Sequence, residues 1–153
     1  GGKDGNVALW KAMERSEKGD VAPLRVMNAH KKKWVNALVW EPLHLSRAVP
    51  RFASASKDGQ IRIWEALSGR CVTSLSGHSM SVTCVRWGGD GLIFSGSQDR
   101  TIKVWAPNET KLVRSLDGHA HWVNCLALNT DAVLRVGGHD HRGIAPPDIE
   151  LQA

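Results

Sequence analysis

The sequence has no apolar run near the roughly 18 residues that a membrane-spanning helix requires. Its first residues lack the charged and apolar pattern of a secretory signal sequence. Cysteine is scarce, with only three among 153 residues. An odd and small number of cysteines argues against a disulfide framework and favours a reducing compartment. These absences speak against a membrane-spanning chain and against a small secreted domain held together by disulfides.

Acidic residues are in the minority, with 15 Asp and Glu against 20 Lys and Arg and a formal net charge of +5. This mild basic excess favours an acidic partner but does not identify one. Helical periodicity also has almost no support anywhere in the chain. Short runs with period-two apolar alternation take its place, and they predict strands.

What the sequence does contain is an internal repeat with a period of 41 residues. The period separates equivalent residues in three sets: Trp64 and Trp105, His78 and His119, and Asp58, Asp99 and Asp140. Three short segments align without gaps, at 34–40, 81–87 and 122–128. A period near 40 residues with Gly-His near its start and Trp near its end resembles the repeat of WD-repeat β-propellers.

The predicted fold is therefore all-β: an arc of a WD-repeat β-propeller with two complete four-stranded blades and a partial blade at each end. The units run as the last strand of a preceding blade (1–10), a blade with two loop insertions (11–64), a complete blade (65–105), a partial blade (106–141) and an irregular tail (142–153). We place the insertions as six residues within 11–21 and seven within 41–50. Since closed rings need roughly 4–8 blades, and the chain opens in mid-repeat without Met, we expect an arc of a larger ring.

Period-two runs bounded by turn residues predict strands at 6–10, 24–27, 35–40, 51–56, 60–65, 70–75, 81–87, 92–97, 101–106, 111–116, 122–128 and 132–138. Cys84 and Cys125 fall at the same position of successive first strands, where we expect small buried side chains. The tail has no strand pattern, because Pro146 and Pro147 lack the N–H groups that a sheet requires.

Histidine, serine, aspartate and tryptophan recur together, and in propellers that this sequence resembles they form a buried hydrogen-bonded tetrad. The matching sets are His30, Ser56, Asp58 and Trp64, then His78, Ser97, Asp99 and Trp105. A third set keeps His119 and Asp140, with Gly138 and Pro146 where Ser and Trp are due. Ser, His and Asp also suggest a hydrolase triad, but active sites do not recur at a fixed period. We therefore expect no enzyme, no catalytic residue and no cofactor.

A second cluster gathers imidazoles and a carboxylate, the ligand types that suit zinc. Its members are His119, His121, His139, Asp140 and His141. Two of them already have tetrad roles, and their spacing matches no usual ligand pattern, so we expect no metal site.

The candidate partner surface is the loop formed by Lys31, Lys32, Lys33 and Trp34, which precedes an inner strand. In propellers such loops open on the face where partners commonly bind. The same place in the next repeats holds Met80, Ser81, His121 and Trp122. A basic and aromatic patch suits a phosphate backbone with stacked bases, whereas the alternative is a merely solvated loop. The sequence leaves both open.

More specific motifs are Trp-Glu-Pro-Leu-His at 40–44, Arg-Phe-Ala-Ser-Ala-Ser-Lys-Asp-Gly at 51–59, Ala-His-Trp-Val-Asn at 120–124, and Val-Leu-Arg at 133–135 before Asp-His at 140–141. Together they resemble the middle propeller repeats of the Notchless family of ribosome-assembly factors over roughly residues 30–141. The chain departs from the generic WD pattern, because Lys11, Glu65 and Ala106 follow the repeat tryptophans in place of Asp.

This resemblance implies an eight-bladed ring that acts in the nucleolus and nucleus as a non-catalytic scaffold in large ribosomal subunit assembly. It implies docking on the pre-ribosomal particle, that is, on ribosomal RNA and on assembly or ribosomal proteins. It also implies a midasin-type AAA ATPase as a partner, engaged through a separate ubiquitin-like domain outside these 153 residues, so no contact residue is carried over. No membrane partner is implied.

A second function stays open: a WD-repeat scaffold of another complex, such as a ubiquitin-ligase substrate receptor that reads a short peptide motif. Co-purification with large-subunit precursors or with a ligase adaptor separates the two. An enzyme would require a pocket of polar residues that do not repeat.

Overall fold

The computed structural model describes residues 1–11, 22–42, 44–45 and 49–129, and every regular element in these ranges is a β-strand. The strands are β1 (Asn6–Leu9), β2 (Arg25–Asn28), β3 (Val35–Trp40), β4 (Arg51–Ser56), β5 (Gln60–Glu65), β6 (Cys71–Ser76), β7 (Val82–Trp87), β8 (Ile93–Ser97), β9 (Ile102–Ala106) and β10 (Lys111–Leu116). Within the described ranges there is no helix long and apolar enough to cross a membrane. The prediction of an all-β chain is confirmed.

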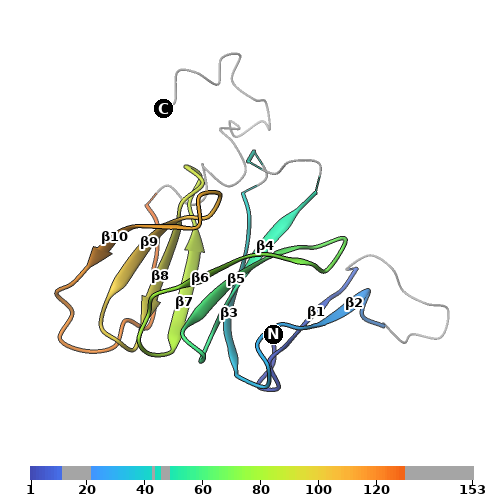
Figure 1. Ribbon diagram of the computed structural model, residues 1–153, viewed down its shortest axis with the longest axis horizontal. Helices are drawn as coiled ribbons and strands as arrows, with labels where there is room; N and C mark the ends of the chain where they lie inside the picture. The colour runs from blue at the N-terminus through green and yellow to red at the C-terminus, as the bar shows by residue number, and fades with distance from the viewer. Residues whose placement is uncertain (12–21, 43, 46–48, 130–153) are drawn as a thin grey trace, which may run out of the picture.

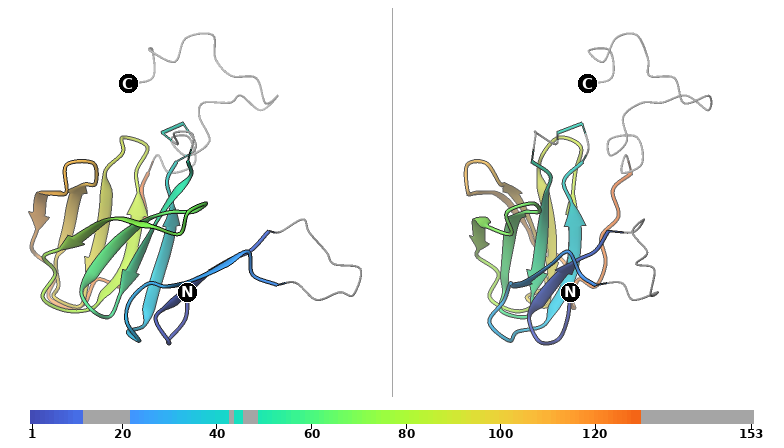
Figure 2. Two further views of the ribbon diagram at one scale, coloured as in Figure 1. Left: turned by 45° about the vertical axis from the view of Figure 1, so that its right-hand side comes forward. Right: turned by 90° about the vertical axis from the view of Figure 1, so that its right-hand side faces the viewer.

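The strands form three antiparallel sheets that follow one another in chain order (Figure 1). A two-stranded sheet pairs β1 with β2, and two four-stranded sheets have the orders β3-β4-β5-β6 and β7-β8-β9-β10. Inner strand β7 packs against β3 and β4 of the sheet before it, and Figure 2 shows the two larger sheets side by side with β1 and β2 beyond them. This is the predicted arc of propeller blades.

The sheets are offset by one strand from the repeat units inferred from the sequence. The 11–64 unit contributes β2 to the first sheet and only β3, β4 and β5 to the second, whose outer strand β6 comes from the next unit. In the same way β10, which follows the repeat tryptophan Trp105, completes the third sheet. Each blade is therefore closed on its outer side by a strand of the following repeat.

Strand positions agree with the sequence in ten cases, each to within one residue at either end. The strand predicted at 122–128 is wrong, because these described residues have no strand assignment. Their backbone still lies against the third blade: Val123 N donates to Ser97 O at 3.1 Å, and Arg86 Nε donates to Leu126 O at 2.9 Å. A strand requires a hydrogen-bonded neighbour, and the next predicted strand, 132–138, lies outside the described residues.

The same segment accounts for a second difference. Cys84 is buried as expected, whereas Cys125 is exposed. The side chain of Cys125 has no second sheet to cover it within the described ranges. All three cysteines are free thiols.

The insertion between β3 and β4 is shorter than predicted. The final pairs of the two equivalent hairpins are Trp40 with Phe52 and Trp87 with Ile93, so the first connection is longer by six residues (12 against 6), not seven. The seventh extra residue lies before β3, which begins five residues after His30, whereas β7 begins four residues after His78. The extra residue therefore belongs to the lysine loop.

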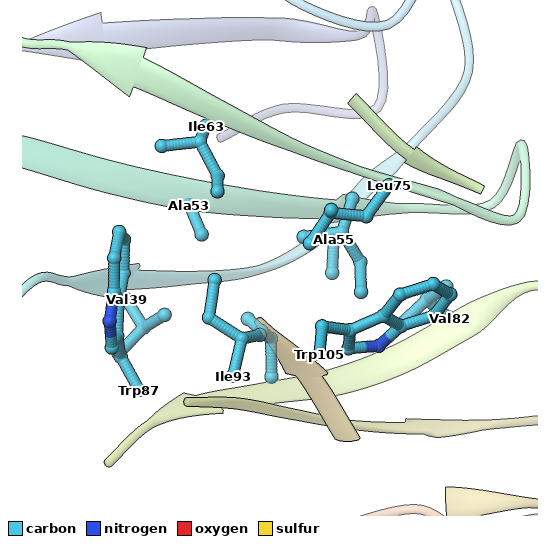
Figure 3. Close-up of a cluster of buried hydrophobic side chains, with 11 residues drawn as sticks. Val39, Ala53, Ala55, Ile63, Leu75, Val82, Trp87, Ile93 and Trp105 are labelled. Carbon is cyan, nitrogen blue, oxygen red and sulfur yellow. The ribbon is translucent and has the colours of Figure 1, made fainter. Parts of the chain in front are cut away.

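The main core lies between the two four-stranded sheets (Figure 3). It is composed of Val39, Ala53, Ala55, Ile61, Ile63, Leu75, Val82, Val85, Trp87, Ile93 and Trp105. Ala53 and Ala55 are small because β4 is a central strand whose face meets the next blade directly, and both are fully buried. Larger side chains from β7, β8 and β9 fill the remaining space, which fixes the angle between the blades.

A smaller core lies between the first two sheets and is packed in the same way. Its buried members are Val7, Met27, Ala29, Phe52, Trp64 and Ala66. Trp64 thus packs toward the preceding sheet, as Trp105 does one blade later. Burial of a tryptophan at each blade interface explains why this residue recurs at the repeat period.

Candidate functional site

A chain of hydrogen bonds ties together the buried polar residues of the second blade. His30 Nδ1 lies 2.9 Å from Asp58 Oδ2, and His30 Nε2 lies 2.8 Å from Ser54 Oγ. Trp64 Nε1 donates to the same Ser54 oxygen at 2.9 Å. One tautomer satisfies every group: His30 Nδ1–H donates to Asp58, and Nε2 accepts from the Ser54 hydroxyl.

The third blade reproduces this network. His78 Nδ1 lies 2.7 Å from Asp99 Oδ2, His78 Nε2 lies 2.8 Å from Ser95 Oγ, and Trp105 Nε1 donates to Ser95 Oγ at 2.8 Å. The imidazole and indole rings also meet edge to face, with centroids 6.1 Å apart.

The serines of both networks differ from those expected from the sequence. Ser54 and Ser95 take the places assigned to Ser56 and Ser97. Serines two residues apart point to the same face of the strand, but only the earlier one is the diagonal neighbour of the tryptophan, which pairs in register with Phe52 or Ile93, and so lies within reach of the indole N–H. Both pairs occur as Ser-x-Ser, and the sequence did not distinguish their members.

Ser56 and Ser97 instead shape the turn that holds the aspartate. Their Oγ atoms accept hydrogen bonds from the N–H of Asp58 and Asp99, at 3.2 and 3.1 Å. The Ser97 hydroxyl also donates to Ser81 O at 2.9 Å. They therefore position the carboxylates rather than the indoles.

These networks do not form a hydrolytic site, although serine, histidine and aspartate are connected in the right order. Ser54 and Ser95 are both fully buried, and each oxygen already accepts from an indole N–H. A nucleophile must reach a substrate carbonyl, and these two hydroxyls have no free path to one. Their role is to satisfy polar groups between strands.

Burial controls the ionisation of the network residues. It lowers the pKa of both His30 and His78, with the carboxylates of Asp58 and Asp99 opposing the shift. Burial alone would raise the pKa of Asp99, but hydrogen bonds from Thr101 and His78 outweigh it and lower the pKa to about 2. At His78 and Asp99 a neutral imidazole beside an ionised carboxylate is therefore the state at neutral pH.

Stability should depend on pH in two stages as a result. The unfolded-state pKa of histidine is about 6.5 and that of aspartate about 3.9. Because the folded His30 and His78 resist protonation, stability is lost as pH falls below about 6.5. Because Asp99 has a lowered pKa, its contribution is present above about pH 4 and is lost as pH falls toward 2.

We expect the melting temperature of the full-length chain to fall between pH 7 and 5 and again below pH 4, as followed by circular dichroism. Asp99→Asn should melt lower above about pH 4 and have a shallower second stage. Identical slopes below pH 4 in wild type and variant would contradict the role of Asp99.

The loop of three lysines is a fixed turn. Lys33 N donates to His30 O at 2.7 Å, and both Lys31 (φ 39°) and Lys32 (φ 67°) have left-handed backbone conformations. Such conformations are uncommon outside glycine and asparagine. Glycine at position 5 makes the turn possible, because a Cβ there would lie 2.8 Å from the nitrogen of Lys32. The turn is thereby anchored to the buried His30.

Trp34 follows the lysine turn and is 45% exposed. The ammonium groups of Lys3 and Lys57 lie 4.8 and 4.6 Å from the centroid of its ring, within the range of cation–π contacts. The backbone is fixed on both sides: Lys57 N donates to Trp34 O at 2.9 Å, and Val35 N donates to Gly2 O at 3.1 Å.

Lys3 and Lys57 were not identified from the sequence. Each directly precedes a turn aspartate, Asp4 or Asp58, so the two lysines share one position in successive repeats. That shared position was the signal available in the sequence. The five lysines of this region (3, 31, 32, 33 and 57) are all exposed.

The other expected contact residues divide into two groups. Met80 and Trp122 are each 48% exposed, and the rings of His121 and Trp122 lie 5.2 Å apart. Ser81 is wrong as a surface residue, because it is 8% exposed and its Oγ accepts from Asn36 Nδ2 at 2.9 Å. A serine in the place of Trp34 leaves room for this contact between blades.

The third tetrad and the histidine cluster are only partly covered by the structure. His119 is exposed, whereas Gly138, His139, Asp140, His141 and Pro146 lie outside the described residues. Among the residues that are described, no three His, Cys, Asp or Glu side chains are grouped as metal ligands.

Comparison with known proteins agrees with the arc of blades and its repeat. The family model for the WD domain, G-beta repeat, matches residues 21–65, 69–106 and 110–142. Protein Notchless of Drosophila melanogaster is 46% identical over 71 residues, which are 46% of this chain and 14% of that protein. Ribosome assembly protein 4 of Chaetomium thermophilum is 53% identical over 55 residues, 35% of this chain and 11% of that protein.

A more distant relative matches a longer stretch: the ribosome biogenesis protein WDR12 homolog of Nematostella vectensis is 32% identical over 97 residues, 63% of this chain and 21% of that protein. The chain thus spans between about a tenth and a fifth of the length of these relatives. The three matched repeats cover most of the sequence, and the blades and their His-Asp-Ser-Trp networks follow the same period. The chain belongs to the WD-repeat family.

Proposed function

We propose that this chain forms part of a non-catalytic scaffold in the assembly of the large ribosomal subunit. The observation that supports this most strongly is its similarity to proteins named Notchless and Ribosome assembly protein 4, over 46% and 35% of the chain. The buried networks recur from blade to blade as structural elements, and the lysine turn and Trp34 are exposed at a blade junction. A rigid arc that presents loops is suited to holding partners in place.

Docking on pre-ribosomal RNA would use the lysine turn and Trp34. The turn presents three ammonium groups beside a half-exposed indole, on backbone held by Gly5 and His30. Cations that neutralise phosphates release counterions, which provides affinity without dependence on sequence. Met80, His121 and Trp122 belong to the same proposed surface.

The wider setting is part of the same proposal. It comprises an eight-bladed ring, a location in the nucleolus and nucleus, ribosomal RNA and proteins of the precursor particle as partners, and a midasin-type AAA ATPase engaged outside these residues. An affinity-tagged full-length chain should sediment with large-subunit precursors on a sucrose gradient. Recovery with a ubiquitin-ligase adaptor and without precursor RNA would favour the substrate-receptor alternative.

Replacing Lys31, Lys32 and Lys33 together by Glu should weaken docking on the precursor particle. It should also flatten the salt dependence of binding by up to about three phosphate contacts. Sedimentation of wild type and triple variant at several salt concentrations measures both effects. The melting temperature should change little, because exposed lysines contribute little to stability.

A matched control reverses the same number of charges elsewhere: Arg70, Lys111 and Arg114, all exposed at or near the outer strands, replaced by Glu. This control should retain binding and its salt dependence. Equal losses in both triple variants would show that only overall charge matters, and unchanged particle association in the lysine-turn variant would remove the turn from the docking surface.

A further inference from the structure

The two lysines at Trp34 come from different blades. Lys3 precedes β1 of the first sheet, whereas Lys57 lies in the turn between β4 and β5 of the second sheet. Trp34 itself precedes β3. The indole and its two ammonium groups therefore span the junction between neighbouring blades.

This arrangement is not required by the propeller. At the next junction Ser81 replaces Trp34 and Gln98 replaces Lys57, and the backbone contact is nevertheless the same: Gln98 N donates to Ser81 O at 2.9 Å. The two blades still pack together there around buried side chains. The indole and its flanking lysines, which occur at only one of these two junctions, are thus not needed for the blades to pack.

The carboxylates near this junction are engaged by the protein itself. Asp4 accepts from Asn6 N and Nδ2, at 3.1 and 2.7 Å. Asp58 accepts from His30 and from the N–H of Gln60, and Arg62 lies 3.5 Å from it. These two carboxylates keep their charge, but the five exposed lysines of this region outnumber them, which leaves a net positive field around an apolar face.

We propose that Lys3, Trp34 and Lys57 bind one unpaired nucleotide of a single-stranded RNA, with the base stacked on the indole and the lysines on the flanking phosphates. The identity of the polymer rests on the function proposed above. A cation–π contact at an exposed site is worth only about 0.5–1 kcal/mol. A base can therefore displace an ammonium group from the ring, and the displaced lysine then gains a phosphate.

The exposed face of the Trp34 indole distinguishes single-stranded RNA from other polyanions. A base in a duplex has both faces covered by its neighbours, so it cannot stack on Trp34, whereas an unpaired base can. An acidic peptide would pair with the lysines but would gain nothing from the flat ring. Single-stranded RNA uses both features.

The test measures binding of the full-length chain to a fluorescein-labelled oligoribonucleotide of ten uridines, by fluorescence anisotropy. Wild type should bind it more tightly than a self-complementary RNA duplex of equal charge and than a ten-residue polyglutamate peptide. Trp34→Ala should weaken binding about 5- to 150-fold, the loss of one stacked base. Lys3→Gln with Lys57→Gln should flatten the slope of log K against log salt by about 1.4.

Trp34→Phe should recover most of the affinity lost in Trp34→Ala, and Lys111→Gln, an exposed lysine on β10, should bind like wild type. Tighter binding of the duplex or of polyglutamate, or full affinity in the Lys3/Lys57 variant, would overturn the proposal. The two proposals fail separately. If the chain sediments with precursor particles but these variants bind the oligonucleotide like wild type, the scaffold function stands and the nucleotide site does not. If the variants weaken oligonucleotide binding but the chain does not sediment with particles, only the nucleotide site stands.

Discussion

Replacing Trp105 by Ala in the full-length chain is expected to lower the free energy of unfolding by about 3–5 kcal/mol. Trp105 is 2% exposed and belongs to the core between the two four-stranded sheets. Its removal leaves a cavity at the blade junction and deprives Ser95 of the indole donor. Both effects act on the same interface, so little of the loss can be recovered by local repacking.

Urea denaturation followed by circular dichroism measures this change. Trp105→Phe keeps one aromatic ring but loses the rest of the indole with its N–H, so its loss of stability should be smaller than that of Trp105→Ala. Val113→Ala, an exposed position on β10, should change stability by about 0.5 kcal/mol or less. A Trp105→Ala variant as stable as the Val113→Ala control would show that the blade junction does not depend on the tryptophan.

Asp99→Ala is expected to cost about 1–3 kcal/mol, since it leaves the buried His78 donor unpaired. The carboxylate accepts from the N–H groups of Ser79 and Thr101 and from His78. An alanine accepts from none of them, and water reaches the site poorly because the Asp99 side chain is only 8% exposed.

Denaturant unfolding of three variants tests this ranking. Asp99→Asn should lose less than Asp99→Ala, because one acceptor oxygen remains. Asp117→Ala, at an exposed position, should change little. From the sequence we also predict that Asp140→Ala costs less than Asp99→Ala, since its repeat lacks the serine and the tryptophan; equal costs would argue against a shared network as the source of the effect.

The sequence predicted the strands and the blade order well because both follow from local patterns that recur. Period-two alternation and glycine-containing turns placed ten strands to within one residue at each end. The His-Asp pairs could also be predicted. His78 and Asp99 in one repeat correspond to His30 and Asp58 in the repeat before it, once the loop insertion between His30 and Asp58 is allowed for. Equivalent residues of successive repeats can be aligned with one another, which identifies their shared positions.

What the sequence did not predict depends on geometry across the sheet. Both serines point to the same side of β4, and the choice of Ser54 over Ser56 is set by which hydroxyl is diagonal to Trp64 and within reach of its indole N–H. Whether Cys125 is buried depends on a neighbouring strand that would cover it, not on the sequence of its own segment. Lys3 and Lys57 converge on Trp34 only because two blades meet there.

The offset between repeat and blade has a consequence for a chain emerging from the ribosome. After Glu65 has emerged, β3, β4 and β5 can pair. The edge of β5 stays unpaired until β6 has also emerged, and β6 ends at Ser76. At about 5–20 residues per second this interval is on the order of one second. During it the nascent blade presents an unpaired strand edge to other nascent chains on the same messenger RNA. Each blade is thus protected from mispairing only once translation has entered the next repeat.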